Sequence, residues 1–178
     1  MRLSVHHHPG GASTAAGRHV VYDIEANAAH FGAASVDGPA LVWQLGPTGD
    51  PAALSAEVDL DPSVEWLMRC DRVDFPTGGI AHRHIHPGPG IRVVLQGGIR
   101  IESEGAVQHH GPFEPWFESG PEPVFAQASD REPTAFVRVM VLPREWEGRR
   151  TISYVDPADA DKPKTQTATV FGEWPITL

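Results

Sequence analysis

Three histidines occupy alternate positions of one short segment, His82, His84 and His86, just before a Pro/Gly turn. Alternate residues of an extended strand share a face, so these three imidazoles are expected to project in the same direction. Neutral imidazole is the commonest protein ligand for divalent transition metals. The spacing therefore points first to a metal site at the end of a strand.

Distance along the strand limits how many of these histidines can serve one ion. His82 and His86 are about 13 Å apart on a strand that rises ~3.3 Å per residue, which is too far for two imidazoles on one metal. The pair His84 and His86 is the stronger candidate, with Glu118 as a third ligand and residues 109–110 as a second histidine pair. In the alternative, the histidines line a polar cavity and contact one another, Glu118 and water. Both interpretations stay open.

Composition excludes several classes of partner. The net charge is −9, from 14 basic and 23 acidic residues, and the basic residues are scattered, so a polyanion such as nucleic acid would be repelled. Twelve of the basic residues are arginines, and the two lysines, Lys162 and Lys164, lie near the C-terminus. The single cysteine, Cys70, excludes an intramolecular disulfide. No segment approaches the roughly 18 apolar residues of a membrane span, so we expect a cytoplasmic protein that binds neither nucleic acid nor membrane.

Glycines and prolines separate short apolar runs, and no amphipathic stretch of helical period reaches three turns, a pattern typical of an all-β sandwich or barrel. Apolar residues hold even positions from 64 to 70 and odd positions at 73 and 75, which predicts a β-bulge near residues 71–72. Strands are expected at 19–23, 39–45, 64–75, 79–86, 91–96, 98–103, 106–110, 114–118, 123–128 and 134–142.

Three parts are expected along the chain. Residues 1–18 are rich in Gly, Ala, Ser and His and are expected to form a mobile N-terminal segment. Residues 19–155 would form the barrel, and residues 156–178 a C-terminal arm. That arm is polar at first and apolar from residue 168 onward. The apolar end must be buried on its own barrel or on a neighbour, which favours a homodimer with exchanged or wrapped arms.

The histidine segment resembles the first motif of the cupin superfamily: a glycine, five residues, His-x-His, three residues, a glutamate, six residues and a glycine. Here that register runs from Gly78 through His84 and His86 to position 90 and Gly97, and every spacing fits. The resemblance covers roughly residues 64–143. It implies an all-β, cupin-type double-stranded β-helix (jelly-roll) barrel, here with extended N- and C-terminal arms, usually dimeric and with a metal or ligand pocket inside.

The chain also departs from the cupin pattern. Position 90, where metal-binding cupins place a glutamate ligand, is Gly90. The second motif is degenerate, and its ligand histidine corresponds to Val124. Two of the four usual metal ligands are therefore missing. Divalent iron, nickel, manganese or zinc held by His84, His86 and His82 is one expectation, and a metal-free pocket is the other.

Two arginines stand among residues expected to be buried. On the inward-facing phase that the resemblance implies, Arg92 points into the barrel, and Arg138 lies in an apolar strand. A buried guanidinium requires an anionic partner or a hydrated pocket. Each arginine could hold a substrate carboxylate or form an internal ion pair with Glu118 or Glu114. Trp116 is the aromatic residue most expected to border the pocket.

Together these observations predict a small-molecule-binding cupin whose ligand is an anion. One hypothesis is a metal-dependent oxygenase, isomerase or lyase that acts on a small carboxylate-bearing substrate, which Arg92, Trp116, Glu118 and Arg138 would bind. The alternatives are a metal-free binding or sensing module without catalysis, and a metal-free enzyme that uses a histidine as acid or base. The sequence does not choose among them and does not identify the substrate.

Overall fold

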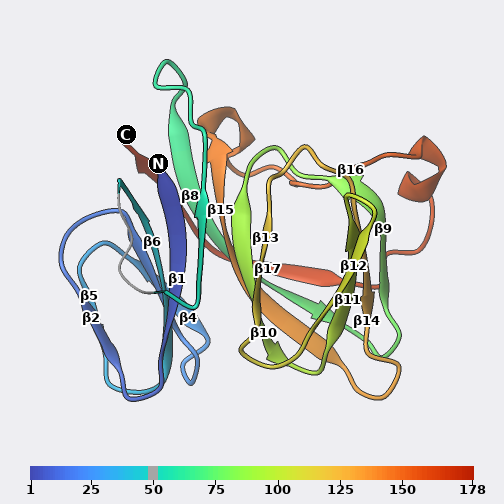
Figure 1. Cartoon of the computed structure of the whole chain (residues 1–178), viewed down its shortest axis with the longest axis horizontal. Helices are drawn as coiled ribbons and strands as arrows, with labels where there is room; N and C mark the ends of the chain where they lie inside the picture. Colours follow the sequence, from blue (N-terminus) through green and yellow to red (C-terminus); the bar gives the residue numbers. More distant parts are fainter. Residues whose placement is uncertain (48–51) are drawn as a thin grey trace.

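The computed structural model describes residues 1–47 and 52–178, and nearly all of its regular structure is antiparallel β-strand (Figure 1). The strands expected between residues 19 and 142 form, most of them within two residues of their expected ends. The elements are β1 (Arg2–His8), β2 (Ala12–Thr14), β3 (His19–Asp23), β4 (Ala28–Phe31), β5 (Ala34–Val36), β6 (Ala40–Gly46), β7 (Leu54–Glu57), β8 (Trp66–Phe75), β9 (Ile80–Ile85), β10 (Gly90–Gln96), β11 (Ile99–Ser103), β12 (Ala106–His110), β13 (Pro115–Glu118), β14 (Val124–Ala128), β15 (Thr134–Pro143), η1 (Arg144–Trp146), β16 (Ser153–Tyr154), η2 (Pro157–Ala160) and β17 (Thr167–Ile176).

Two five-stranded sheets form the barrel. Their strand orders are β13-β10-β15-β8-β17 and β12-β11-β14-β9-β16. From β8 to β15 the chain passes repeatedly from one sheet to the other, which is the winding of a double-stranded β-helix. The prediction of an all-β, cupin-type jelly-roll barrel is confirmed.

The N-terminal residues form a third sheet rather than a mobile segment. Its order is β4-β3-β6-β1-β7, and it packs beside the barrel (Figure 1). Leu3 and Val5 of β1 are fully buried, and the indole of Trp43 donates to the Ile91 carbonyl of the barrel at 3.1 Å. The expectation of a mobile segment over 1–18 is wrong, because β1 lies inside this sheet. The barrel itself begins at Trp66, not at residue 19.

The change from even to odd apolar positions in β8 needs no bulge. Its pairing with β15 is regular from Trp66 to Phe75. Met68 and Cys70 pack toward the N-terminal sheet, whereas Val73 and Phe75 belong to the core inside the barrel. The strand therefore contributes to two cores on opposite faces, so the predicted bulge near 71–72 is wrong. The register shift lies instead in β17, opposite this part of β8.

The C-terminal segment pairs with its own barrel and is partly buried there. Strand β17 pairs with β8, and its Trp174 stacks on Phe31 of the N-terminal sheet with ring centroids 5.5 Å apart. The sequence allowed the apolar arm to pack on its own barrel or on a neighbour. Packing on its own barrel needs no exchange between protomers. Among the described residues, no helix is both long and apolar enough to cross a membrane.

Candidate functional site

A small cavity of about 50 Å³ lies between the two barrel sheets. It brings together six of the seven predicted site residues: His84, His86, Arg92, Trp116, Glu118 and Arg138. The remaining lining is mainly apolar and consists of Val73, Phe75, Ala81, Ile101, Ala126, Phe136, Ile152, Gln166 and Ala168.

His82 does not join this group. Between Ala81 and His84, β9 advances three residues while its partner β14 advances two, which is a β-bulge. Ala81 and His84 therefore both line the cavity, whereas His82 stays outside it and partly exposed. The prediction of one shared face for the three histidines is wrong, because an unbroken alternation along the strand was assumed.

His84 and His86 each anchor one ring nitrogen on a backbone carbonyl. Nδ1 of His84 donates to the His82 carbonyl at 2.7 Å, and Nδ1 of His86 donates to the Thr151 carbonyl at 2.6 Å. Since a carbonyl only accepts, the neutral rings carry their lone pair on Nε2. Burial lowers the pKa of both histidines, and two nearby guanidiniums lower it further, so both rings are neutral at pH 7.

Arg92 and Glu118 form an ion pair across neighbouring strands. Nη2 of Arg92 lies 2.6 Å from Oε2 of Glu118, without the alignment of a hydrogen bond. Nη1 of Arg92 donates to the Gly90 carbonyl at 2.6 Å, and the indole of Trp116 donates to Oε1 of Glu118 at 2.8 Å. Burial lowers the pKa of Arg92 to about 10, and Glu118 opposes this effect, so the guanidinium stays charged at pH 7.

Arg138 is fixed by Asp71, a residue that sequence reasoning missed. Nε and Nη2 of Arg138 donate to the two oxygens of Asp71 at 2.6 and 3.3 Å. The same carboxylate accepts from Nε of Arg69 at 3.0 Å. Nη1 of Arg138 lies 3.4 Å from Nε2 of His86. The sequence does show an acidic residue, Asp71, within an apolar strand, which indicates a buried charge. Its partner Arg138 could not be identified, because it lies 67 residues away.

The donor set does not fit a divalent metal. The Nε2 lone pair of His86 faces Arg138, and the carboxylate of Glu118 is held by Arg92. An ion on these ligands would lie beside two guanidiniums, which repel a cation. Among the described residues, no three His, Cys, Asp or Glu side chains are grouped as metal ligands.

There is also no space at position 90 for the side chain of the usual glutamate ligand. A Cβ on Gly90 would stand 2.7 Å from the Val139 carbonyl oxygen and 3.0 Å from Nη1 of Arg92. Arg92 therefore occupies the region into which a side chain at position 90 would extend. Val124, at the position of the second-motif histidine, is buried and pairs with His84.

The segment after the barrel closes the cavity on one side. Ile152, Gln166 and Ala168 all line it. The hydroxyl of Thr165 accepts from the amide of Ile80 and donates to its carbonyl, both at 2.9 Å, which fastens this segment to β9. These residues show no periodic pattern in the sequence, so their part in the site was not predicted.

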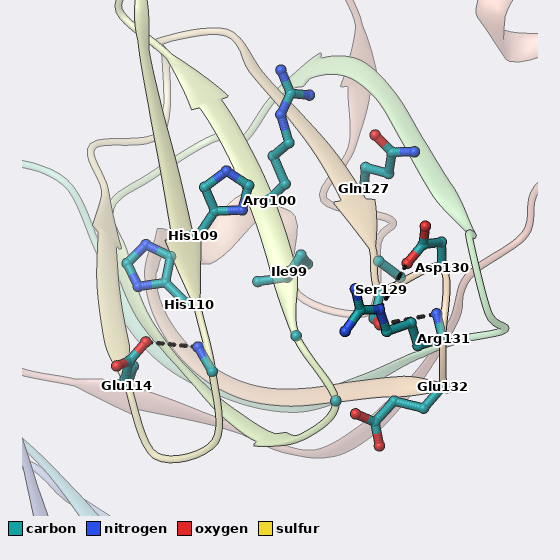
Figure 2. Close-up of a pocket in the computed structure, with 14 residues that line it drawn as sticks. Ile99, Arg100, His109, His110, Glu114, Gln127, Ser129, Asp130, Arg131 and Glu132 are labelled. Carbon is teal, nitrogen blue, oxygen red and sulfur yellow. Dashed lines mark hydrogen bonds and ion pairs between the residues drawn. The ribbon is translucent and has the colours of Figure 1, made fainter.

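A second, larger hollow of about 730 Å³ lies on the outer surface around β11 and β12 (Figure 2). It contains the other predicted histidine pair, His109 and His110. The ring of His110 stacks on Trp116 with centroids 5.1 Å apart, and Glu114 accepts from the Gly111 amide at 2.7 Å. The hollow is open and carries charges of both signs, so the buried cavity is the stronger candidate site.

No family model and no curated protein matches the sequence. Solved structures are similar to about half of this chain. The DMSP lyase DddQ from Ruegeria pomeroyi DSS-3 is 21% identical with a TM-score of 0.44, and the similar region covers 51% of this chain and 44% of that protein. A cupin 2 domain-containing protein from Halorhodospira halophila is 14% identical with a TM-score of 0.43, covering 52% and 61%.

KdgF from Halomonas sp. is 22% identical with a TM-score of 0.36, and the similar region covers 46% of this chain and 72% of that protein. The similar region covers less than two thirds of the length of DddQ and of the Halorhodospira halophila protein. These similarities do not extend to an activity. The strand order and the spacing of the first motif independently agree with a cupin-type barrel.

Proposed function

We propose that this protein binds a small organic anion, a short carboxylic or keto acid, in the barrel cavity without a metal. The observation that carries the proposal is the charge of the cavity wall. Its charged side chains are two arginines, Arg92 and Arg138, and one carboxylate, Glu118, while both histidines are neutral. Two guanidiniums therefore border the cavity of a protein of net charge −9, and each is paired with one carboxylate, Arg92 with Glu118 and Arg138 with Asp71 behind the wall.

Low polarity around these charges strengthens their attraction for an anion. Phe136, Val73 and other apolar side chains make up the rest of the wall. Electrostatic interactions are stronger in such surroundings than in water. A carboxylate could accept N–H groups from Arg92 or Arg138, the side chains best suited to planar oxyanions.

The size of the cavity restricts the ligand. At about 50 Å³ it is far smaller than the ~300–1,000 Å³ of typical pockets for larger ligands. It offers room for a few heavy atoms only. We therefore place the ligand among acids of the size of acetate or pyruvate.

A second candidate function is proton transfer, in which the protein is a metal-free enzyme. It is favoured by His84, whose Nδ1–H is fixed on a carbonyl so that Nε2 is the basic nitrogen. A neutral imidazole beside two guanidiniums could remove a proton next to the carboxylate of a bound acid, and the guanidiniums would stabilise the resulting enolate. His84→Gln would then abolish proton exchange at that carbon while leaving acid binding intact.

The test of binding is a melting-temperature screen with acetate and pyruvate against their neutral analogues acetamide and acetone. A ligand that binds only the folded state raises the melting temperature, so the acids should raise it and the neutral analogues should not. The double variant Arg92→Gln/Glu118→Gln removes both charges without leaving one unpaired, and it should lose most of the shift. Arg131→Gln, which removes an exposed charge, is the control. Equal shifts with acids and neutral analogues would contradict the proposal.

Elemental analysis of the purified protein tests the metal-free part separately. We expect clearly less than one equivalent of iron, nickel, manganese and zinc together. One full equivalent that disappears in His84→Ala/His86→Ala would show instead that this pair holds a metal.

A further inference from the structure

A basin of about 210 Å³ lies next to the cavity, on the outer side of the segment that closes it. The two hollows share Arg138, Ile152, Gln166 and Ala168 in their walls. The other residues of the basin are Arg69, Arg150, Thr151 and Lys164. The basin is not needed for the binding proposed above, and its composition differs from that of the cavity.

All the charged side chains that line the basin are cationic. Arg69, Arg138, Arg150 and Lys164 provide four positive charges, and no carboxylate is among its described lining residues. Only 14 of the 178 residues are basic, and acidic residues outnumber them. Asp71 and Glu173 pair with the two buried arginines, so Arg150 and Lys164 supply the excess positive charge around the hollow, and such an excess attracts anions.

The floor of the basin is rigid. Arg69 and Arg138 are both buried and share the carboxylate of Asp71. Arg69 also binds Glu173 at 2.9 Å and the Arg149 carbonyl at 2.8 Å through Nη1. These contacts use Nε and Nη1, so the two N–H groups on Nη2 of Arg69 remain to donate to a ligand. A fixed guanidinium loses little conformational entropy when it binds an oxyanion.

The rim adds two exposed cations from separate parts of the chain. Arg150 donates to the hydroxyl of Tyr154 at 3.0 Å and lies over that ring, 5.3 Å from its centroid. Lys164 is exposed and lies in the segment that leads into β17. The charges of floor and rim thus come from β8, β15 and two loops, and they surround a space large enough for a tetrahedral anion.

We propose that this basin binds a small, doubly charged oxyanion of the phosphate class, either free phosphate or the phosphate group of a small monoester. Several cationic donors around one point suit the oxygens of a dianion better than a single carboxylate. Arg138 lines both hollows, whereas Arg150 and Lys164 do not line the cavity, so variants at these two residues test the basin alone.

The test is calorimetric titration of the full-length protein with inorganic phosphate at low salt, with glycerol 3-phosphate as the monoester and chloride as the monovalent control. We expect saturable binding of phosphate or of the monoester, and the tighter of the two identifies the source. Arg150→Gln/Lys164→Gln should weaken that binding by about tenfold or more. Both side chains are exposed, so the fold should persist.

Arg83→Gln is the matched control, because it removes an exposed charge outside the basin. It should leave the affinity unchanged. Arg92→Gln/Glu118→Gln should also leave phosphate binding intact while abolishing binding of short acids, so the two proposals can fail separately. Absence of saturable binding, or equal binding by wild type and Arg150→Gln/Lys164→Gln, would overturn the basin proposal.

Discussion

Asp71 pairs with two buried guanidiniums at once. Arg69 and Arg138 both contact its carboxylate, and Asp71 itself is fully buried. Burying a charge is costly unless it is paired, so the fold depends on this one carboxylate to keep both arginines in place. The geometry of the cavity and of the basin follows from it, since Arg138 lines both.

We expect Asp71→Asn to lower the free energy of unfolding by about 3–5 kcal/mol, because it leaves the buried Arg138 without its carboxylate partner and Arg69 with Glu173 alone. Urea denaturation measures this change. Asp74→Asn on the same strand is the control, since Asp74 pairs with Arg72 at a more exposed position and should contribute at most about 1 kcal/mol. Equal effects of the two substitutions would show that Asp71 has no special role.

The buried histidines predict a dependence of stability on pH. Burial lowers the pKa of His84 and His86 in the folded protein, whereas the unfolded chain protonates near the ordinary pKa of about 6.5. Below that pH the unfolded state binds more protons, so the free energy of unfolding falls as pH falls, by at most about 1.4 kcal/mol per pH unit for each histidine.

Denaturation at pH 8, 6 and 5 tests this dependence. His86→Gln should reduce the loss of stability between pH 8 and 5, and His109→Gln, at an exposed position, should not. An unchanged pH profile in His86→Gln would be inconsistent with a buried neutral ring at this position.

Gly90 shows how a single position excludes the usual carboxylate ligand. We expect Gly90→Ala to destabilise the protein by about 1–3 kcal/mol, because its Cβ would contact the Val139 carbonyl oxygen at 2.7 Å and Met140 Cγ at 2.9 Å. Gly98→Ala is the matched control, with its nearest neighbour at 3.6 Å. Thermal unfolding compares the two variants, and equal melting temperatures would mean that space is available at position 90.

At the scale of elements, the barrel strands could be predicted from the sequence, because apolar alternation and Gly/Pro turns are local signals. The N-terminal sheet was harder to predict. Strand β1 combines Leu3 and Val5 with a run of histidines at 6–8, and its burial depends on pairing with β6 about 40 residues away. The site was predicted in part, since motif spacing located His84 and His86, but no local pattern reports the bulge that excludes His82 or the pairing of Asp71 with Arg138.

Leu3→Ala tests whether β1 belongs to the folded core. We expect a loss of about 2–5 kcal/mol in the free energy of unfolding, because Leu3 is fully buried between the N-terminal sheet and the barrel. Leu178→Ala removes the same atoms at an exposed position and should have little effect. If both variants unfold like wild type, the first residues are mobile after all.

At the scale of the molecule, the two largest apolar clusters of the described residues lie between the barrel and the N-terminal sheet and inside the barrel. Strand β8 lies between them and contributes side chains to both. It also carries Asp71, so the residue that fixes the site is supported by packing on both faces of its sheet. The N-terminal sheet thus stabilises the site without contributing a residue to the cavity lining described above.

The homodimer expected from the sequence now rests on a different feature. The apolar arm packs on its own barrel and is only partly buried, β17 is the last strand of its sheet, and Val170 on it is 45% exposed. An open edge strand can pair with the same strand of a second copy. We therefore expect light scattering to give about twice 19.3 kDa, and Val170→Glu to reduce this to the monomer mass without unfolding the barrel.

Val107 is the control, because it is 53% exposed on β12, the edge strand of the other barrel sheet. Val107→Glu should leave the dimer intact. A monomeric wild-type protein would contradict the dimer, and dissociation by Val107→Glu alone would assign the contact to β12.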